Sequence, residues 1–180
     1  PKISLRFNSS DMKDYSSSDK KININNIFSN NRLGITDSFE AGRSLTLGLD
    51  FKKEKLENIN KYFEIKLGTV LRDKEEKNIP KISTLNRKNS NLFGSISNSL
   101  SENLTINYNF ALDNNLSSFE YNDIRTKISL NNLITEFSFL EESGEMGDSS
   151  FLENMTTLTI DENNFKKFNS RRNRKLNLTE

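Results

Sequence analysis

Two segments decide the fold: residues 104–112, LTINYNFAL, and residues 124–139, IRTKISLNNLITEFSF. Apolar and polar residues alternate in both, and an Asn131-Asn132 pair interrupts the second segment. Period two places successive side chains on opposite faces of a strand, whereas it scatters apolar groups around a helix. The two segments therefore predict long antiparallel strands, and the second one predicts a hairpin.

A tight turn at Asn131-Asn132 fixes the register of this hairpin. With two residues in the turn, the pairs are Leu130 with Leu133, Ile128 with Thr135, Thr126 with Phe137 and Ile124 with Phe139. All eight side chains then share one face, so the turn and the alternation predict the same pairing independently.

Similar alternation along the chain predicts up to ten strands. The expected ranges are 2–8, 20–28, 43–52, 61–71, 91–100, 104–112, 119–130, 133–140, 151–160 and 165–171. We expect an all-β fold, an antiparallel up-and-down meander that forms a partial, open transmembrane β-barrel of about ten long strands. The whole chain, residues 1–180, is expected to be a single segment of an outer-membrane β-barrel domain without a separate second domain.

The predicted connections alternate in length. Residues 29–42, 72–90 and 141–150 form long connections, whereas 101–103 and 131–132 form short turns. Outer-membrane barrels have short periplasmic turns and long external loops, and a strand of about ten residues, tilted near 45°, spans their lipid-facing band of roughly 25 Å. Only the connection before residue 20 is longer than this alternation prefers.

We expect the apolar stripe of each strand to face lipid and the polar stripe to face a wet interior. A wide barrel has no packed core to fill, which fits a chain with 33% hydrophobic residues and a mean hydropathy of −0.72. The candidate lumen-facing residues are Glu64, Lys66, Thr105, Asn107, Asn109, Arg125 and Lys127.

The composition disfavours an enzyme. The chain has no Cys and no His, so it lacks thiolates, the usual general base and the commonest metal ligand. We therefore predict no catalytic residues, no cofactor and no metal site, and we interpret the acidic residues 141–148 as a solvated loop. A net charge of +1 predicts no nucleic-acid partner. No apolar run reaches the length of about 18 residues that a membrane-spanning helix needs.

The segment Asn31-Arg32-Leu33-Gly34-Ile35-Thr36-Asp37-Ser38-Phe39-Glu40-Ala41-Gly42-Arg43 resembles a loop-to-strand passage of the outer-membrane lipopolysaccharide-assembly family, LptD, also called OstA or Imp. In that family a short Asn-Arg stretch leads to an Asp, an acidic residue, a Gly and an Arg that opens a strand. Asp37, Glu40, Gly42 and Arg43 match this pattern, whereas Ser38 stands where the family commonly has Arg. Residues 168–173, followed by 177–180, are similar to a late-barrel segment of the family.

The resemblance implies a large barrel in the Gram-negative bacterial outer membrane that inserts lipopolysaccharide into the outer leaflet. It implies contact with lipopolysaccharide and outer-membrane lipid, and it implies two partners, a plug lipoprotein inside the barrel and a periplasmic transport bridge. The four motif residues are expected to be structural. Asp37, Glu40 and Arg43 would fix the loop and the strand start through hydrogen bonds and an ion pair.

Two alternatives stay open. Another outer-membrane barrel, such as a porin or transporter, shares this physics but carries different cargo. A secreted or surface β-sheet adhesin would instead cover its apolar face in water. Dependence on detergent separates the adhesin from the barrels, and selective loss of surface lipopolysaccharide on depletion separates an assembly barrel from a porin.

Overall fold

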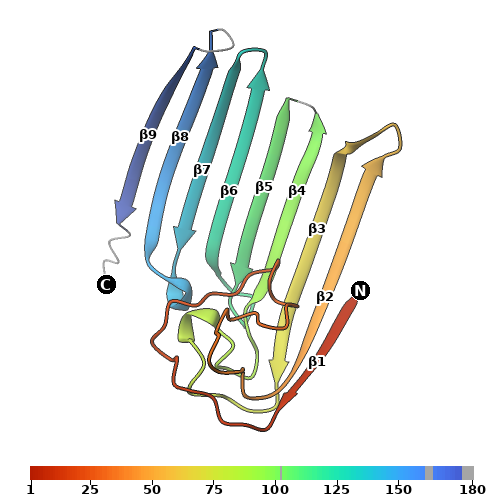
Figure 1. Cartoon of the computed structure of the whole chain (residues 1–180), viewed down its shortest axis with the longest axis vertical. Coiled ribbons are helices and arrows are strands. Elements are labelled where there is room, and N and C mark those ends of the chain that lie inside the picture. The colour runs from red at the N-terminus through yellow and green to blue at the C-terminus, as the bar shows by residue number, and fades with distance from the viewer. Residues whose placement is uncertain (102, 161–163, 176–180) are drawn as a thin grey trace.

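Nine antiparallel strands form one sheet in the computed structural model, which describes residues 1–101, 103–160 and 164–175 (Figure 1). The strand order in the sheet is the order in the sequence. The sheet is not closed within these residues, and the expected all-β meander, a partial and open barrel, is confirmed. The described part of the chain has no helix that is both long and apolar enough to cross a membrane. The strands are β1 (Lys2–Asn8), β2 (Gly42–Lys55), β3 (Asn58–Arg72), β4 (Leu92–Ser101), β5 (Leu104–Leu112), β6 (Phe119–Leu130), β7 (Leu133–Glu142), β8 (Ser149–Thr159) and β9 (Phe165–Lys175), with short 3-10 helices η1 (Lys81–Ser83) and η2 (Gly144–Met146) between strands.

The hairpin of β6 and β7 has the predicted register. Leu130 pairs with Leu133 and Ile124 pairs with Phe139, and the two intervening pairs are also as expected. Asn131 adopts a positive φ of 48°, a conformation that Asn tolerates better than most residues and that tight hairpin turns require. The turn chemistry and the alternation of side chains therefore act together to set this register.

The register divides the sheet into two faces, because residues that pair across strands point to the same side. We call one the apolar face and the other the polar face. One row on the apolar face contains Phe51, Ile65, Ile96, Tyr108 and Ile124. The adjacent row on the polar face contains Asp50, Lys66, Ser95, Asn109 and Asp123.

The strand predicted for residues 20–28 is wrong, and the described sheet has nine strands rather than ten. These residues form turns inside the long connection 9–41. Ile22, Ile24 and Ile27 are fully or nearly fully buried, and the last spacing of three breaks period two. The isoleucines belong to a loop that packs against the sheet, and their burial there accounts for the apolar residues in this segment. Removing this strand also removes the exception to the alternation of connection lengths.

Connections 9–41 and 73–91 fold over the polar face at the loop end of the sheet, and we call them the cap (Figure 1). The ring of Phe28 occupies the space that a Cβ on Gly48 would need. A Cβ on Gly68 would lie 3.0 Å from Ile24 and 3.5 Å from Ile27, so these side chains also lie close to the strand. Glycines on β2 and β3 thus let the cap approach the strands closely. The buried core comprises Met12, Ile22, Ile24, Ile27, Leu33, Ile35, Ala41, Val70, Ile79, Leu85, Phe93, Ala111 and Met146.

The last strand departs from the two-faced pattern. By register, Lys166 and Arg172 of β9 lie on the apolar face, where they pair with Leu158 and Leu152 of β8. The strand also runs to Lys175 and not only to residue 171. Residues 177–180, part of the second family resemblance, lie outside the described residues. The apolar face is therefore best developed over β1–β8.

Candidate functional site

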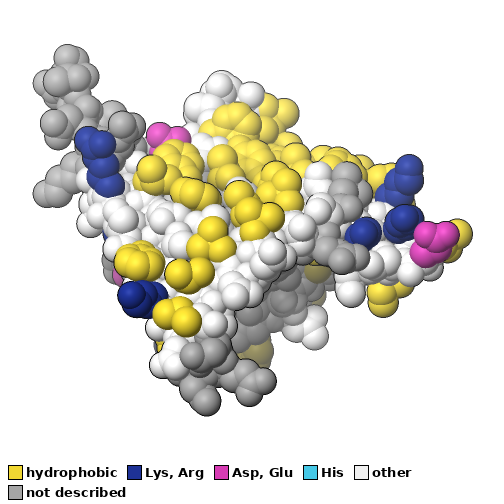
Figure 2. Space-filling view, turned by 90° about the horizontal axis from the view of Figure 1, so that it is seen from above, with side chains coloured by type: hydrophobic (Ala, Val, Ile, Leu, Met, Phe, Trp, Pro, Cys, Tyr) yellow, Lys and Arg dark blue, Asp and Glu magenta, His cyan; other side chains and the backbone are white. Residues whose placement is uncertain are grey.

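The apolar face carries large hydrophobic side chains that are exposed (Figure 2). Leu5 and Phe7 are 80% and 74% exposed. A large contiguous patch of exposed apolar side chains is uncommon on soluble monomers and marks a surface that contacts a partner or a membrane. Seen from the turn end, yellow side chains form a broad patch over the strands. The exposed members on this face include Ile3, Leu5, Phe7, Leu49, Phe51, Leu104, Ile124, Leu130, Leu133, Phe137, Leu152, Leu158 and Phe168.

Polar side chains on the apolar face of β7 and β8 satisfy one another. The hydroxyls of Thr135 and Thr156 are 2.8 Å apart, and Asn154 donates to the Thr135 hydroxyl at 3.0 Å. Polar groups without partners are costly in hydrocarbon, so this mutual pairing makes the group compatible with an apolar environment.

The polar face contains a hollow beside the cap. It has a volume of about 420 Å³ and is lined by side chains from β3–β6 and by Asn23 and Asn25 of the cap. The seven residues expected to face the lumen all lie on the polar face by register. Five of them line the hollow: Glu64, Lys66, Asn107, Asn109 and Arg125.

Charges in and near the hollow are paired with each other. Asp123 accepts from the Arg125 guanidinium at 3.1 Å and from the Asn109 amide at 3.2 Å. Lys66 and Glu64 form an ion pair of 2.8 Å. Because each positive group lies beside a carboxylate, the hollow presents a hydrogen-bonding surface without a strong field of either sign. It can hold water and hydroxyl-rich or amide-rich groups.

A buried charge cluster joins the cap to the sheet. Glu40 accepts two hydrogen bonds from Arg32, at 2.7 and 2.5 Å, and a third from Arg72 at 2.5 Å. Arg32 also donates to the hydroxyls of Thr46 and Ser44 on β2, at 2.9 and 3.1 Å. The side chains of Arg32 and Arg72 are 0% and 1% exposed. This cluster ties residues 31–41 to β2 and β3.

The surroundings of Glu40 favour its charged form. Burial acts to raise the pKa of this carboxyl, but the hydrogen bonds from Arg32 and the charges of Arg32 and Arg72 outweigh it and hold the pKa below its ordinary value of 4.5. A buried carboxylate between two guanidinium groups is satisfied only while all three are present. The geometry thus makes Glu40 the centre of the cap attachment.

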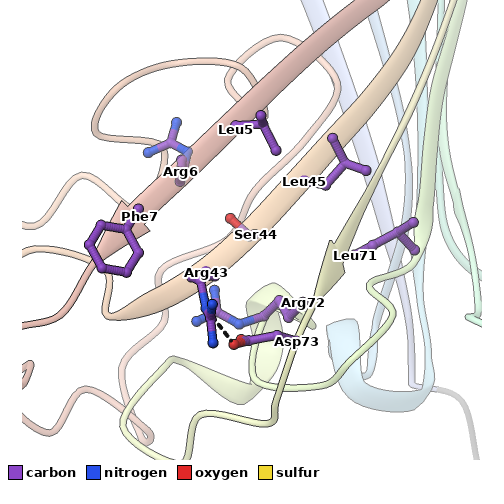
Figure 3. Close-up of a pocket in the computed structure, with 9 residues that line it drawn as sticks. All are labelled: Leu5, Arg6, Phe7, Arg43, Ser44, Leu45, Leu71, Arg72 and Asp73. Carbon is purple, nitrogen blue, oxygen red and sulfur yellow. Dashed lines mark hydrogen bonds and ion pairs between the residues drawn. The ribbon is translucent and has the colours of Figure 1, made fainter.

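Gly42 and Arg43 form the start of β2. Gly42 has φ of +86°, and a Cβ there would lie 2.9 Å from the Arg72 guanidinium. Arg43 forms an ion pair of 2.9 Å with Asp73 at the end of β3, beside an apolar groove lined by Leu5, Leu45 and other residues (Figure 3). These contacts hold the ends of β2 and β3 together at the border of the apolar face.

Asp37 joins two parts of the cap. Its carboxylate accepts from Lys13 Nζ at 2.7 Å and from the Tyr15 hydroxyl. The hydrogen bonds from Lys13 and Tyr15 lower the pKa of Asp37 below its ordinary value. Because these groups are exposed to solvent, the contact orders the loop and adds little to overall stability.

Sequence reasoning missed Arg72, Thr46 and the buried isoleucines of the cap. Arg72 lies far from Glu40 in the sequence, and only the pairing of β2 with β3 brings it close. For the isoleucines a signal was present: Ile27 follows Ile24 by three positions, which interrupts the alternation of a strand. A buried loop segment is the structure that fits such a break.

The molecule so described is a curved antiparallel wall with one face apolar and exposed, one face polar, and long loops at a single end, which is the design of an outer-membrane β-barrel. The chain matches the family model "LptD: LPS transport system D" over residues 4–156. This match covers most of the chain, so the protein belongs to the LptD family. The family resemblance based on residues 31–43 is thereby confirmed.

Membership in this family defines the general function. Its members are transport and assembly proteins for lipopolysaccharide at the outer membrane of Gram-negative bacteria, and the family is not one of enzymes. No curated protein and no solved structure matched the chain. The finer role of the present residues therefore has to be argued from their geometry.

Proposed function

We propose that this chain forms part of the wall of the translocon barrel that inserts lipopolysaccharide into the outer leaflet. Its apolar face would contact outer-membrane lipid, and its polar face, with the seven candidate residues, would border a wet lumen. The chain would be one segment of that barrel domain. The four motif residues would serve as structural attachments of the cap, since their contacts lie within the loop and the strand ends.

The height of the apolar band carries this proposal. On the apolar face of β2, Arg43 and Lys53 enclose Leu45, Leu47, Leu49 and Phe51. Arg43 and Lys53 are ten residues apart, which is about 33 Å along a strand and about 23 Å along the membrane normal at a tilt near 45°. That distance approximates the roughly 25 Å apolar band of outer-membrane barrels.

Family membership supports the proposed partners. The polar hollow offers amide, hydroxyl and paired charged groups, which suit a hydrated sugar chain or the surface of a plug lipoprotein in the lumen. The periplasmic transport bridge would deliver lipopolysaccharide from the turn end. The cap would close the opposite, external end along this part of the wall.

Arginine substitutions on adjacent positions of β5 test the orientation of the wall. We expect Phe110→Arg, on the apolar face, to destabilise the protein folded in a bilayer by about 2–4 kcal/mol if residue 110 lies near the midplane. Asn109→Arg, on the polar face beside Asp123, should change it little. Urea titration of the protein folded into vesicles measures both. Equal tolerance of the two changes would contradict the proposed orientation.

Depletion of the protein in cells tests the cargo. We expect surface lipopolysaccharide to fall while other outer-membrane barrels are still inserted. Unchanged surface lipopolysaccharide together with lost uptake of small solutes would instead indicate a porin or transporter.

A further inference from the structure

The tip of the β2–β3 hairpin differs from the rest of the apolar face. Lys53 lies on this face because it pairs with Phe63. Lys53, Lys55, Lys61 and Phe63 line one groove of about 680 Å³, together with Leu56 at the turn. Leu56 is 101% exposed. Lysines and exposed apolar groups thus adjoin each other at one end of the apolar band.

Two other turns at this end have no such lysines, although Lys166 follows the β8–β9 turn. Within the described residues, the β6–β7 tip is Leu130-Asn131-Asn132-Leu133, and the β4–β5 tip includes Ser101 and Asn103. In the view from the turn end, dark blue side chains lie at the side of the β2–β3 hairpin and also at the opposite side of the sheet (Figure 2). The β2–β3 tip therefore differs from the β4–β5 and β6–β7 tips by its lysines and by the groove that they line.

The two carboxylates that border the groove have partners other than Lys53. Glu54 also borders the groove, but it is paired with Lys52 at 2.5 Å. Glu57 lies 3.5 Å from Lys55 and both groups are largely exposed, so the pair is weak. Lys53, at the edge of the apolar band, adds a positive charge that these two carboxylates leave in excess.

We propose that the β2–β3 tip binds the phosphate headgroup of an anionic phospholipid in the leaflet on the turn side. Lys53 and Lys55 would contact the phosphate, while Leu56 and Phe63 would contact the upper acyl chains. Long lysine side chains at the border of a membrane extend to the headgroups in this way. The inference rests on the proposed membrane orientation, and it places the site in the periplasmic leaflet, where the short turns of such barrels lie.

Photo-crosslinking in vesicles tests the site. A benzophenone amino acid replaces Leu56 in the full-length protein, and in a second protein it replaces Leu130, which lies at a tip without lysines. Both proteins are folded into phosphatidylcholine vesicles that contain a minority of phosphatidylglycerol. Mass spectrometry then gives the ratio of the two lipid adducts at each position.

We expect phosphatidylglycerol adducts to be enriched about fivefold at position 56 relative to position 130. The double variant Lys53→Gln/Lys55→Gln should abolish this enrichment, whereas the charge-matched variant Lys66→Gln/Lys127→Gln on the polar face, away from the groove, should keep it. Equal ratios at both positions, or equal loss in both variants, would overturn the headgroup site while leaving the membrane wall intact. Absence of lipid adducts at both positions would overturn the membrane orientation itself.

Discussion

The polar face is built differently in its two halves. Near the loops it is lined by small residues, Gly48, Gly68 and Ala111, and the cap packs against them with buried isoleucines. Near the turns the same strands carry Glu64, Lys66 and other charged or amide side chains around an open hollow. The strands do not change direction or register between the halves.

The difference shows that side-chain size decides where a barrel wall accepts a loop. A glycine lets a loop side chain reach the strand backbone, whereas a charged residue keeps its own hydration and repels an apolar loop. One face can therefore hold a packed core at one end and a wet surface at the other. Substitutions in the two halves should have very different effects.

The largest effect is expected for Glu40→Gln. The change leaves the buried Arg32 and Arg72 without their carboxylate, and loss of one partner of a buried pair costs about 3–5 kcal/mol. Urea unfolding of the folded protein measures this loss. Glu54→Gln, which breaks the exposed pair with Lys52 in the turn half, is the control and should have little effect. Similar losses for the two variants would contradict the contrast between the halves.

A smaller loss is expected for Ile27→Ala. Ile27 is 0% exposed beneath the cap, and truncation of a buried isoleucine costs about 2–3 kcal/mol at a site that can partly relax. Ile59→Ala, at a position 70% exposed near the β2–β3 turn, is the control. A cysteine introduced in place of Asn109 should also react faster with a polar thiol reagent in the Ile27→Ala background, since the cap is loosened. An unchanged reaction rate would show that Ile27 does not hold the cap in place beside the hollow.

The stability contribution of Glu40 should depend on pH. Because its pKa in the folded protein lies below the ordinary value of 4.5, the contribution is complete above that value and is lost as the pH falls through the folded pKa. Unfolding free energies measured from neutral to acidic pH should therefore fall more steeply for the wild type than for Glu40→Gln. Parallel curves for the two proteins would show that Glu40 is not held in its charged form.

The smallest effect is expected for Asp37→Asn. The change removes exposed contacts to Lys13 and Tyr15, so global stability should stay nearly constant. Residues 9–19 should nevertheless become more sensitive to limited proteolysis, because the cap loses a link between its two parts. Cleavage at the wild-type rate would show that this link does not order the loop.

Most strands were predictable because their alternation is long and their turns are short. β1, β5 and β6 begin and end where the sequence predicts, and the Asn131-Asn132 turn fixes the register of β6 and β7. The prediction of a strand at residues 20–28 failed because two isoleucines at period two are also compatible with a loop that buries them. Apolar residues in a local pattern indicate that their side chains are kept from water. The pattern does not distinguish burial inside the protein from contact with lipid.

The charge cluster was only partly predictable. Glu40 came from the family resemblance, whereas Arg72 required the register of β2 against β3. Successive side chains of a strand point to opposite faces, so the alternation alone predicts that the seven candidate lumen-facing residues lie on the polar stripes of their strands. Their position beside the cap depends on how residues 9–41 fold back, which no local pattern specifies.

The sequential order of the strands has a consequence for biogenesis. Since each strand hydrogen-bonds only to its neighbours along the chain, the wall can be extended one hairpin at a time, and each new pair needs only local loop closure. A shift of one residue in any hairpin would invert the faces of that strand relative to its neighbour. Turns such as Asn131-Asn132, which fix the register, therefore also fix which face of the sheet is apolar.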